Sequence, residues 1–338
     1  MNFIKKFIHS KTFTLICLYL AMILVFTVWA ALKDINFLQI SIFRNILKSL
    51  VIPGFLTLGA GCLLIAGHMD LSQSAAGAFG GMVLATAIKA WSMPWYLAII
   101  VCLAMCAVLG LVNGLLVVKL HFPSFIGTLA MASMIRGLMY LFSSMANVDP
   151  SGNHVAANIN FVDNTIKYLG TGMVGGPTGI PFNVILLVIA FVGFGLLMSK
   201  SAFGMKVTLL GGSPVAATLA GINANAILLI LFMLSAVMGG VSGIFQAAQV
   251  SQGNLQALTT SQFIGLTAAI LGGISFGGGV GGMGGAFIGL LILRTFVVGM
   301  GIVGVNPSWV NVFSGLLLLV ALSFDFFAQL RQAKKLSH

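Results

Sequence analysis

Apolar runs long enough to cross a lipid bilayer recur along almost the whole chain. A spanning helix needs about 20 apolar residues. In lipid the backbone must satisfy its own hydrogen bonds, so such runs fold as helices. The sequence therefore predicts an all-α polytopic membrane protein with about ten transmembrane helices. The runs lie near residues 13–32, 46–67, 71–88, 94–118, 124–143, 181–199, 226–248, 262–276, 283–302 and 309–328.

The charged residues are too few for most kinds of catalysis. Only 6% of the chain is charged and the acidic residues number five, which leaves little material for acid–base chemistry or a carboxylate metal site. The chain has no G-x-x-x-x-G-K-[ST] phosphate loop. We therefore expect no enzyme activity, no metal and no cofactor bound by this chain itself. The Lys and Arg are scattered at segment ends, a pattern that does not suggest nucleic acid.

The distribution of Lys and Arg predicts the orientation of the chain. With the N-terminus placed inside, more of these residues fall on inside segments than on outside ones, as in proteins of the bacterial cytoplasmic membrane. Both termini are then cytoplasmic. The longest polar insertion, residues 144–180, falls outside. It is either a docking surface for an external partner or only a connecting loop.

Half of the residues from 270 to 289 are glycine. Each interior glycine costs a helix about 1 kcal/mol relative to alanine, so the helix is expected to break near Gly277–Gly282 and to resume at Gly285. Such a break survives at membrane depth only where protein or a watery cavity covers the backbone. Alternatively the glycines only permit close helix contact, since Gly285 and Gly289 form a small-xxx-small pair.

A weak internal repeat runs through a single transmembrane domain that covers residues 1–338. Residues 77–81 (GAFGG) and 285–289 (GAFIG) share four of five residues, and each pentapeptide opens an apolar helix beside a polar or glycine-rich break. Short, interrupted helices in two related halves are typical of transporters. We therefore expect a first repeat at about 46–143 and a second at about 226–328, although chance similarity between glycine-rich segments is an alternative.

Several polar residues lie within or beside the predicted spans. Asp70 with Ser72 is placed to cap the third helix, and a proton relay between Asp70 and His68 is the less favoured alternative. Arg136 and Arg294 fall inside spans, where each needs a partner or water. Uncharged polar groups suit either a neutral polyol or ordinary contacts between helices. The candidate residues of a translocation pathway or gate are Asp70, Ser72, Asn113, Phe125, Thr128, Arg136, Gln246, Gly273, Ser275 and Arg294.

The main inside loop, residues 200–225, contains the sequence GGSPVAATLAGI. Its Ser213-Pro214 pair, followed by small and apolar residues, predicts a short helix with a serine cap and proline at the first helical position. We expect this helix to lie on the cytoplasmic side of the membrane.

Several segments, taken in order, resemble the permease subunits of ATP-binding-cassette importers for simple sugars, the ribose and galactose group. The resemblance covers nearly the whole chain. The matching pieces are GHMDLS (67–72), NGLLVVK (113–119), PSFIGTL (123–129), Arg136-Gly137, Phe203-Gly204, GGSP to AGI (211–222), LGGISFGGGV (271–280) and GVNPSW (304–309).

The resemblance implies a homodimer with the pathway at its interface, an extracytoplasmic sugar-binding protein, and separate ATPase subunits that bind ATP and Mg. It also implies that the short helix in the 200–225 loop meets the ATPase. Val215 stands where the family usually has an acidic residue, and residues 259–263 also lack an acidic residue that is common there. The coupling loop comprises Gly211, Gly212, Ser213, Pro214, Val215, Ala216, Ala217 and Gly221.

The function that these features favour is the pore subunit of an ATP-driven importer, which carries a monosaccharide or similar small polyol into the cytoplasm by alternating access. An ion-gradient-driven secondary transporter of a small neutral solute is the alternative, with His68, Asp70 and Arg294 as its coupling residues. A membrane scaffold whose outer loop recruits a partner is a third class.

Overall fold

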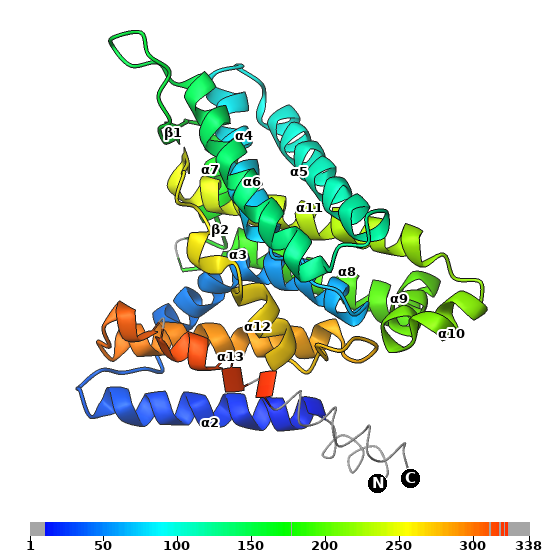
Figure 1. Cartoon of the computed structure of the whole chain (residues 1–338). Helices are drawn as coiled ribbons and strands as arrows, with labels where there is room; N and C mark the ends of the chain where they lie inside the picture. The colour runs from blue at the N-terminus through cyan, green and yellow to red at the C-terminus, as the bar shows by residue number, and fades with distance from the viewer. Residues whose placement is uncertain (1–10, 177, 311, 318, 321, 324–338) are drawn as a thin grey trace.

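The computed structural model describes residues 11–176, 178–310, 312–317, 319–320 and 322–323, and almost all of its regular structure is helical (Figure 1). Within these residues, seven helices are long and apolar enough to cross a membrane, which confirms the all-α polytopic class. These helices are α2 (Lys11–Ala31), α3 (Ile40–Ile65), α5 (Trp95–Val118), α6 (Ser124–Ala146), α8 (Phe182–Lys200), α11 (Ala224–Val250) and α13 (Met283–Ile302).

Shorter elements complete the described chain. The third and eighth predicted spans are indeed short, because α4 has 17 residues and α12 has 8. The tenth predicted span, 309–328, lies partly outside the described residues. The shorter helices are α4 (Gln73–Lys89), α7 (Asn164–Thr171), α9 (Ala202–Gly212), α10 (Pro214–Leu219), α12 (Ile264–Leu271) and the 3-10 turn η1 (Thr259–Ser261). The strands are β1 (Ile159–Asn160), β2 (Met173–Val174), β3 (Ile180–Pro181) and β4 (Gln252–Gly253).

Helix α11 runs through the middle of the molecule and packs against α3, α4 and α5. Small residues allow the closest of these approaches: a Cβ atom on Gly77 of α4 would lie only 2.5 Å from the carbonyl oxygen of Gly239 on α11. Between α3 and α11, the rings of Phe55 and Phe245 stack with their centroids 5.2 Å apart. These contacts make the α3, α4 and α11 helices the buried centre of the fold.

The outer helices present apolar side chains to their surroundings. Helix α2 lies beside α13 at one edge of the molecule (Figure 1), and its buried Phe26 covers Gly299. Most of its other face is exposed, including Leu24 at 64%. An exposed apolar face of this extent would be unstable in water and is what lipid contact requires.

The 144–180 insertion has structure of its own. Strand β1 pairs antiparallel with β4, which follows α11, and β2 pairs antiparallel with β3. Asp163 caps α7 by accepting a hydrogen bond from the backbone N–H of Ile166 at 2.8 Å. Figure 1 places β1, β2 and α7 on the side of the molecule opposite α9 and α10. The insertion therefore forms one face of the molecule and the predicted short cytoplasmic helix belongs to the other.

Candidate translocation site and coupling helix

Asp70 is 3% exposed and lies between α3 and α4. Its Oδ1 accepts hydrogen bonds from the backbone N–H of Ser72 at 2.8 Å and from the Ser72 hydroxyl at 2.6 Å. Its Oδ2 accepts one from the hydroxyl of Ser235, on α11, at 2.9 Å. The Asp70 carboxylate therefore orders the turn that leads into α4. The predicted cap by Ser72 was wrong: Ser72 occupies the N-cap position of α4, but its hydroxyl donates to Asp70 and accepts no hydrogen bond from the helix.

Two further predicted residues join this polar cluster. Asn113 of α5 donates from Nδ2 to the Ser72 hydroxyl at 2.6 Å. Thr128 of α6 accepts from the backbone N–H of Leu71 at 3.0 Å. The structure thus brings Asp70, Ser72, Asn113 and Thr128 together from three segments that are far apart in the sequence.

The cluster retains unused hydrogen-bonding capacity. Nε2 of Gln73 and Oδ1 of Asn113 are buried without a protein partner. Leaving such a group unpaired costs about 1–3 kcal/mol, so a polar group from a water or a passing solute would be stabilised here. Sequence reasoning missed Gln73 and Ser235. A signal existed for Ser235, a polar residue in the middle of an otherwise apolar helix.

His68 does not extend this cluster toward a proton relay. Its ring packs against Phe232, with the ring centroids 6.4 Å apart and nearly perpendicular. Both carboxylate oxygens of Asp70 already accept hydrogen bonds from serine groups. The geometry favours a structural role for Asp70 over the proton relay.

The predicted glycine break lies between the end of α12 at Leu271 and the start of α13 at Met283. Four glycines of this break, Gly273, Gly278, Gly279 and Gly281, have φ angles of 88°, 82°, 71° and 123°, a region that side-chain-bearing residues rarely adopt. Within the break the N–H of Gly277 donates to the Ser275 hydroxyl at 3.3 Å. The break is therefore real and is wider than the predicted 277–282.

Further along α13, glycine also has the alternative role, which is to permit close contact between helices. A Cβ atom on Gly289 would lie 2.5 Å from the backbone nitrogen of Gly272, so α13 folds back tightly against the end of α12. The two interpretations of the glycine-rich segment are thus both correct, for different glycines.

Three separate segments meet at a contact that we call the glycine junction, defined by Gly67, Gly211, Gly278 and Gly279. The N–H of Gly279 donates to the carbonyl of Ile65, at the end of α3, at 2.8 Å. A Cβ atom on Gly278 would lie 2.8 Å from the Cα of Gly67, and one on Gly211 would lie 2.7 Å from the nitrogen of Gly279. Backbone therefore packs directly on backbone where the two helix breaks meet the end of α9.

Helix α10 follows the glycine junction in the chain. The Ser213 hydroxyl accepts a hydrogen bond from the N–H of Ala216 at 3.2 Å, and Pro214 is the first helical residue, which confirms the predicted capped helix. Gly221, with a φ of 73°, lies just beyond its end. Ala217 is buried, whereas Val215 and Leu219 are 72% and 85% exposed. Helix α10 therefore packs against the rest of the protein through Ala217 and exposes the apolar side chains of Val215 and Leu219.

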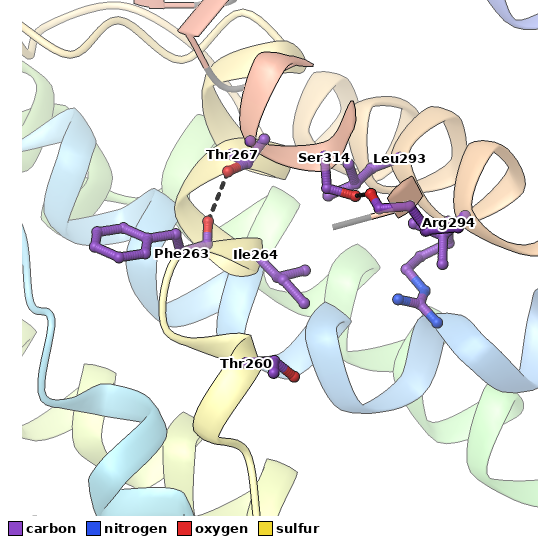
Figure 2. A pocket seen from close by; sticks show the side chains of 10 residues that line it. Thr260, Phe263, Ile264, Thr267, Leu293, Arg294 and Ser314 are labelled. Carbon is purple, nitrogen blue, oxygen red and sulfur yellow. Dashed lines mark hydrogen bonds between the residues drawn. The ribbon is translucent and has the colours of Figure 1, made fainter. Parts of the chain in front are cut away.

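The two arginines inside spans have different environments. Nη1 of Arg136, on α6, donates to the carbonyl of Ala257 at 3.0 Å. Nε of Arg294, on α13, donates to the hydroxyl of Ser49 on α3 at 3.3 Å. A charge at membrane depth costs roughly 2.5–3.5 kcal/mol, which these contacts offset in part. Arg294 also lines a cavity of about 420 Å³ beside α12 (Figure 2).

Of the two remaining predicted pathway residues, Gln246 lies apart from the polar cluster, whereas Phe125 lies beside it, three residues before Thr128 on α6. Gln246 is partly buried on α11, eleven residues after Ser235 and hence roughly 16 Å further along the helix. Phe125 is 47% exposed on α6. Within the part of the chain that the structure describes, no group of three or more His, Cys, Asp and Glu side chains is arranged to hold a metal.

Comparison with known proteins gives the family. Residues 42–322 match the family model described as branched-chain amino acid transport system / permease component. The chain is 27% identical over 315 residues to the galactose/methyl galactoside import permease protein MglC of Escherichia coli, covering 90% of each chain. It is 28% identical over 290 residues to the ribose import permease protein RbsC of the same organism, covering 86% of this chain and 87% of the relative.

A third relative is the fructose import permease protein FrcC of Rhizobium meliloti, at 26% identity over 280 residues, covering 83% of this chain and 76% of the relative. No solved structure matches the chain. The family match covers almost all of α3 and every later helix to α13, and with them the Asp70 cluster, the glycine junction and α10, but not α2. The chain therefore belongs to the permease family whose model is described as branched-chain amino acid transport system / permease component.

Proposed function

We propose that this chain is the membrane-spanning pore subunit of an ATP-driven importer that carries a monosaccharide or similar small polyol into the cytoplasm. Three of its relatives are named as import permeases for galactose or methyl galactoside, for ribose and for fructose. In this proposal ATP and Mg bind to separate ATP-binding-cassette subunits, and a sugar-binding protein delivers the cargo to the face formed by residues 144–180. Two copies of the chain form the pore in the bacterial inner membrane, with both termini cytoplasmic.

The observation that carries this proposal is the position of the glycine junction beside α10. Gly211 is the next-to-last residue of α9, two residues before the Ser213 cap of α10, and it packs on the backbone of Ile65 and Gly279. A displacement of α10 by an ATPase would therefore move the α3–α4 turn and the α12–α13 break directly. Backbone contacts backbone at this point, and no flexible side chain lies in between to absorb the movement. Rocking of two repeats about such breaks is how alternating access is achieved in many transporters.

The surface of α10 indicates how the ATPase contact is made. Val215 and Leu219 are exposed apolar side chains on a helix of only six residues. Val215 replaces the acidic residue that is usual in sugar permeases, so we propose an apolar contact rather than an ion pair. Burying two such side chains contributes about 1.5–3 kcal/mol each.

The test is co-expression of the chain with the ATP-binding-cassette subunit that co-purifies with it. Val215→Asp and Leu219→Asp are expected to lower substrate-stimulated ATPase activity by about tenfold or more, since about 1.4 kcal/mol of lost contact already costs a factor of ten. Val215→Leu and Leu219→Ile are the matched controls, because each keeps an apolar side chain at the same exposed position. Ala217 is unsuitable for this test because it is buried, and a bulky charge there would disrupt α10 itself.

Unchanged ATPase stimulation in both variants would show that α10 is not the coupling contact.

A second candidate, the ion-gradient-driven transporter, is favoured only by the buried carboxylate of Asp70. In that case uptake into liposomes that hold this chain alone would follow a proton or sodium gradient.

A further inference from the structure

The cavity beside Arg294 has polar groups at fixed positions on an otherwise apolar wall. It measures about 420 Å³ and lies between α12, α13 and the helical residues Val310, Ser314 and Gly315, within the size range of small-molecule sites. Thr260 is exposed at its rim, so the cavity opens to the surroundings of the chain. Figure 2 shows Thr260, Thr267 and Ser314 around it, and the Arg294 guanidinium reaching away from α13 toward α3.

Arg294 carries a positive charge that no contact within the described part of the chain neutralises. A guanidinium has five N–H donors and stays protonated. Among the described residues, Arg294 makes one hydrogen bond, from Nε to the Ser49 hydroxyl. No carboxylate of the described residues forms an ion pair with it. The terminal nitrogens thus offer a charged, forked donor that matches the two oxygens of a carboxylate or phosphate.

The hydroxyls of the cavity offer the complementary chemistry. The Thr267 hydroxyl donates to the carbonyl of Phe263 and the Ser314 hydroxyl donates to that of Val310, each at 2.7 Å. Because their hydrogens are engaged, these two oxygens have only lone pairs left for a ligand. They can accept hydrogen bonds from hydroxyl groups but cannot donate to an anion.

We propose that this cavity binds a ligand that carries one carboxylate or phosphate together with hydroxyl groups. Arg294 would hold the anionic group, and Thr267 and Ser314 would accept from the hydroxyls. Two sources share this chemistry: a sugar acid or sugar phosphate in transit, and the headgroup of phosphatidylglycerol. The first source rests on the proposed transport function and narrows its substrate class; the second is independent of that function.

The experiment uses the purified full-length chain in phosphatidylcholine nanodiscs and needs neither ATP nor a partner. Binding of D-gluconate, D-glucuronate and sn-glycerol 3-phosphate is compared with that of D-glucose and glycerol by equilibrium dialysis. In a second arm, the chain is reconstituted in equal amounts of phosphatidylglycerol and phosphatidylcholine, and retained lipid is counted by native mass spectrometry. Neither readout depends on ATPase coupling, so failure here is distinct from failure of the proposed function.

Arg294→Gln is expected to weaken binding of the preferred anionic probe or lipid by about tenfold or more, as the loss of a buried charged partner does. Arg136→Gln is the matched control, because Arg136 is also an intramembrane arginine but donates to a backbone carbonyl. Preference for an anionic sugar probe identifies cargo, and preference for phosphatidylglycerol alone identifies lipid. Should the unmodified chain bind anionic and neutral probes equally and retain both lipids equally, the proposal is wrong, whether or not Arg294→Gln folds.

Discussion

Gly211 and Gly279 lie so close together that a Cβ atom on Gly211 would be 2.7 Å from the backbone nitrogen of Gly279. The two residues come from the end of α9 and from the α12–α13 break. Their contact connects the segment that leads into α10 with the segment that interrupts the transmembrane helices. In the proposed mechanism, a push on α10 reaches the interior of the protein through this contact.

Substitution of Gly211 tests the glycine junction directly. Gly211→Ala is expected to destabilise the protein by about 1–3 kcal/mol, because the added methyl group meets backbone that has no room to move. Gly212→Ala is the control, since a Cβ atom there meets only the Cα of Gly279, at 3.9 Å. Thermal unfolding in detergent and ATPase stimulation are measured for both variants. Equal behaviour of the two would show that the junction is not rigid.

The Asp70 carboxylate gives a second prediction. Asp70→Asn keeps an oxygen that can accept from the Ser72 N–H and is expected to retain ATP-driven uptake, because a purely structural role needs the hydrogen bond and not the negative charge. Asp70→Ala leaves the hydroxyls of Ser72 and Ser235 without their shared acceptor and is expected to lower stability by about 1–3 kcal/mol. Both variants are compared by thermal unfolding and by uptake. Loss of uptake in Asp70→Asn with unchanged stability would instead support ion coupling.

The contact between α4 and α11 depends on glycines whose neighbours are backbone. A Cβ atom on Gly243 would clash with the backbone of Gly77, whereas one on Gly193 of α8 would meet nothing within 4 Å. We expect Gly243→Ala to lower thermal stability by forcing the two helices apart. Gly193→Ala is expected to raise it, by about 0.5–1 kcal/mol, because alanine is the better helix former. If Gly243→Ala lowers thermal stability and Gly193→Ala raises it, the result supports close packing of α4 on α11 and open space beside α8.

The 144–180 insertion is expected to respond to pH through Asp149. The backbone N–H of Asn153, with smaller contributions from the Asn153 side chain and the N–H groups of Ser151 and Gly152, holds the pKa of this exposed carboxylate below its usual value. The folded turn is therefore favoured while Asp149 is ionised, and this contribution is lost as pH falls below about 4. Limited proteolysis of the turn should rise over that range. In Asp149→Asn the rise should be absent.

Local chemistry made part of this structure predictable. Segment length and hydropathy located the spans, and Ser213 followed by Pro214 located the start of α10. Gly273 explains why α12 stops at Leu271, since its φ of 88° is incompatible with helix. The start of α3 was placed six residues too late, because Arg44 looked like the edge of the apolar run. In the structure its guanidinium reaches the carbonyl of Thr178 at 2.5 Å, and the helix extends through it.

Long-range contacts were not predictable from one sequence. The bond between Asp70 and Ser235 joins residues 165 positions apart, and that between Arg294 and Ser49 joins residues 245 apart. Local pattern identified Asp70 and Arg294 as residues that need partners but contained no information on which hydroxyl would supply one. The glycine junction was missed for the same reason, because glycines that touch across the fold have no side-chain pattern to reveal them.

The glycine junction also has a genetic consequence. Where a side chain is crowded by another side chain, trimming the neighbour can restore the fit, so second-site suppressors are common. At Gly211 the crowding atoms belong to the main chain of Ile65 and Gly279, and no codon change can shorten a peptide group. Selection for regained growth on the transported solute, starting from Gly211→Ala, should therefore return true revertants at codon 211 rather than compensating changes at the residues that it touches.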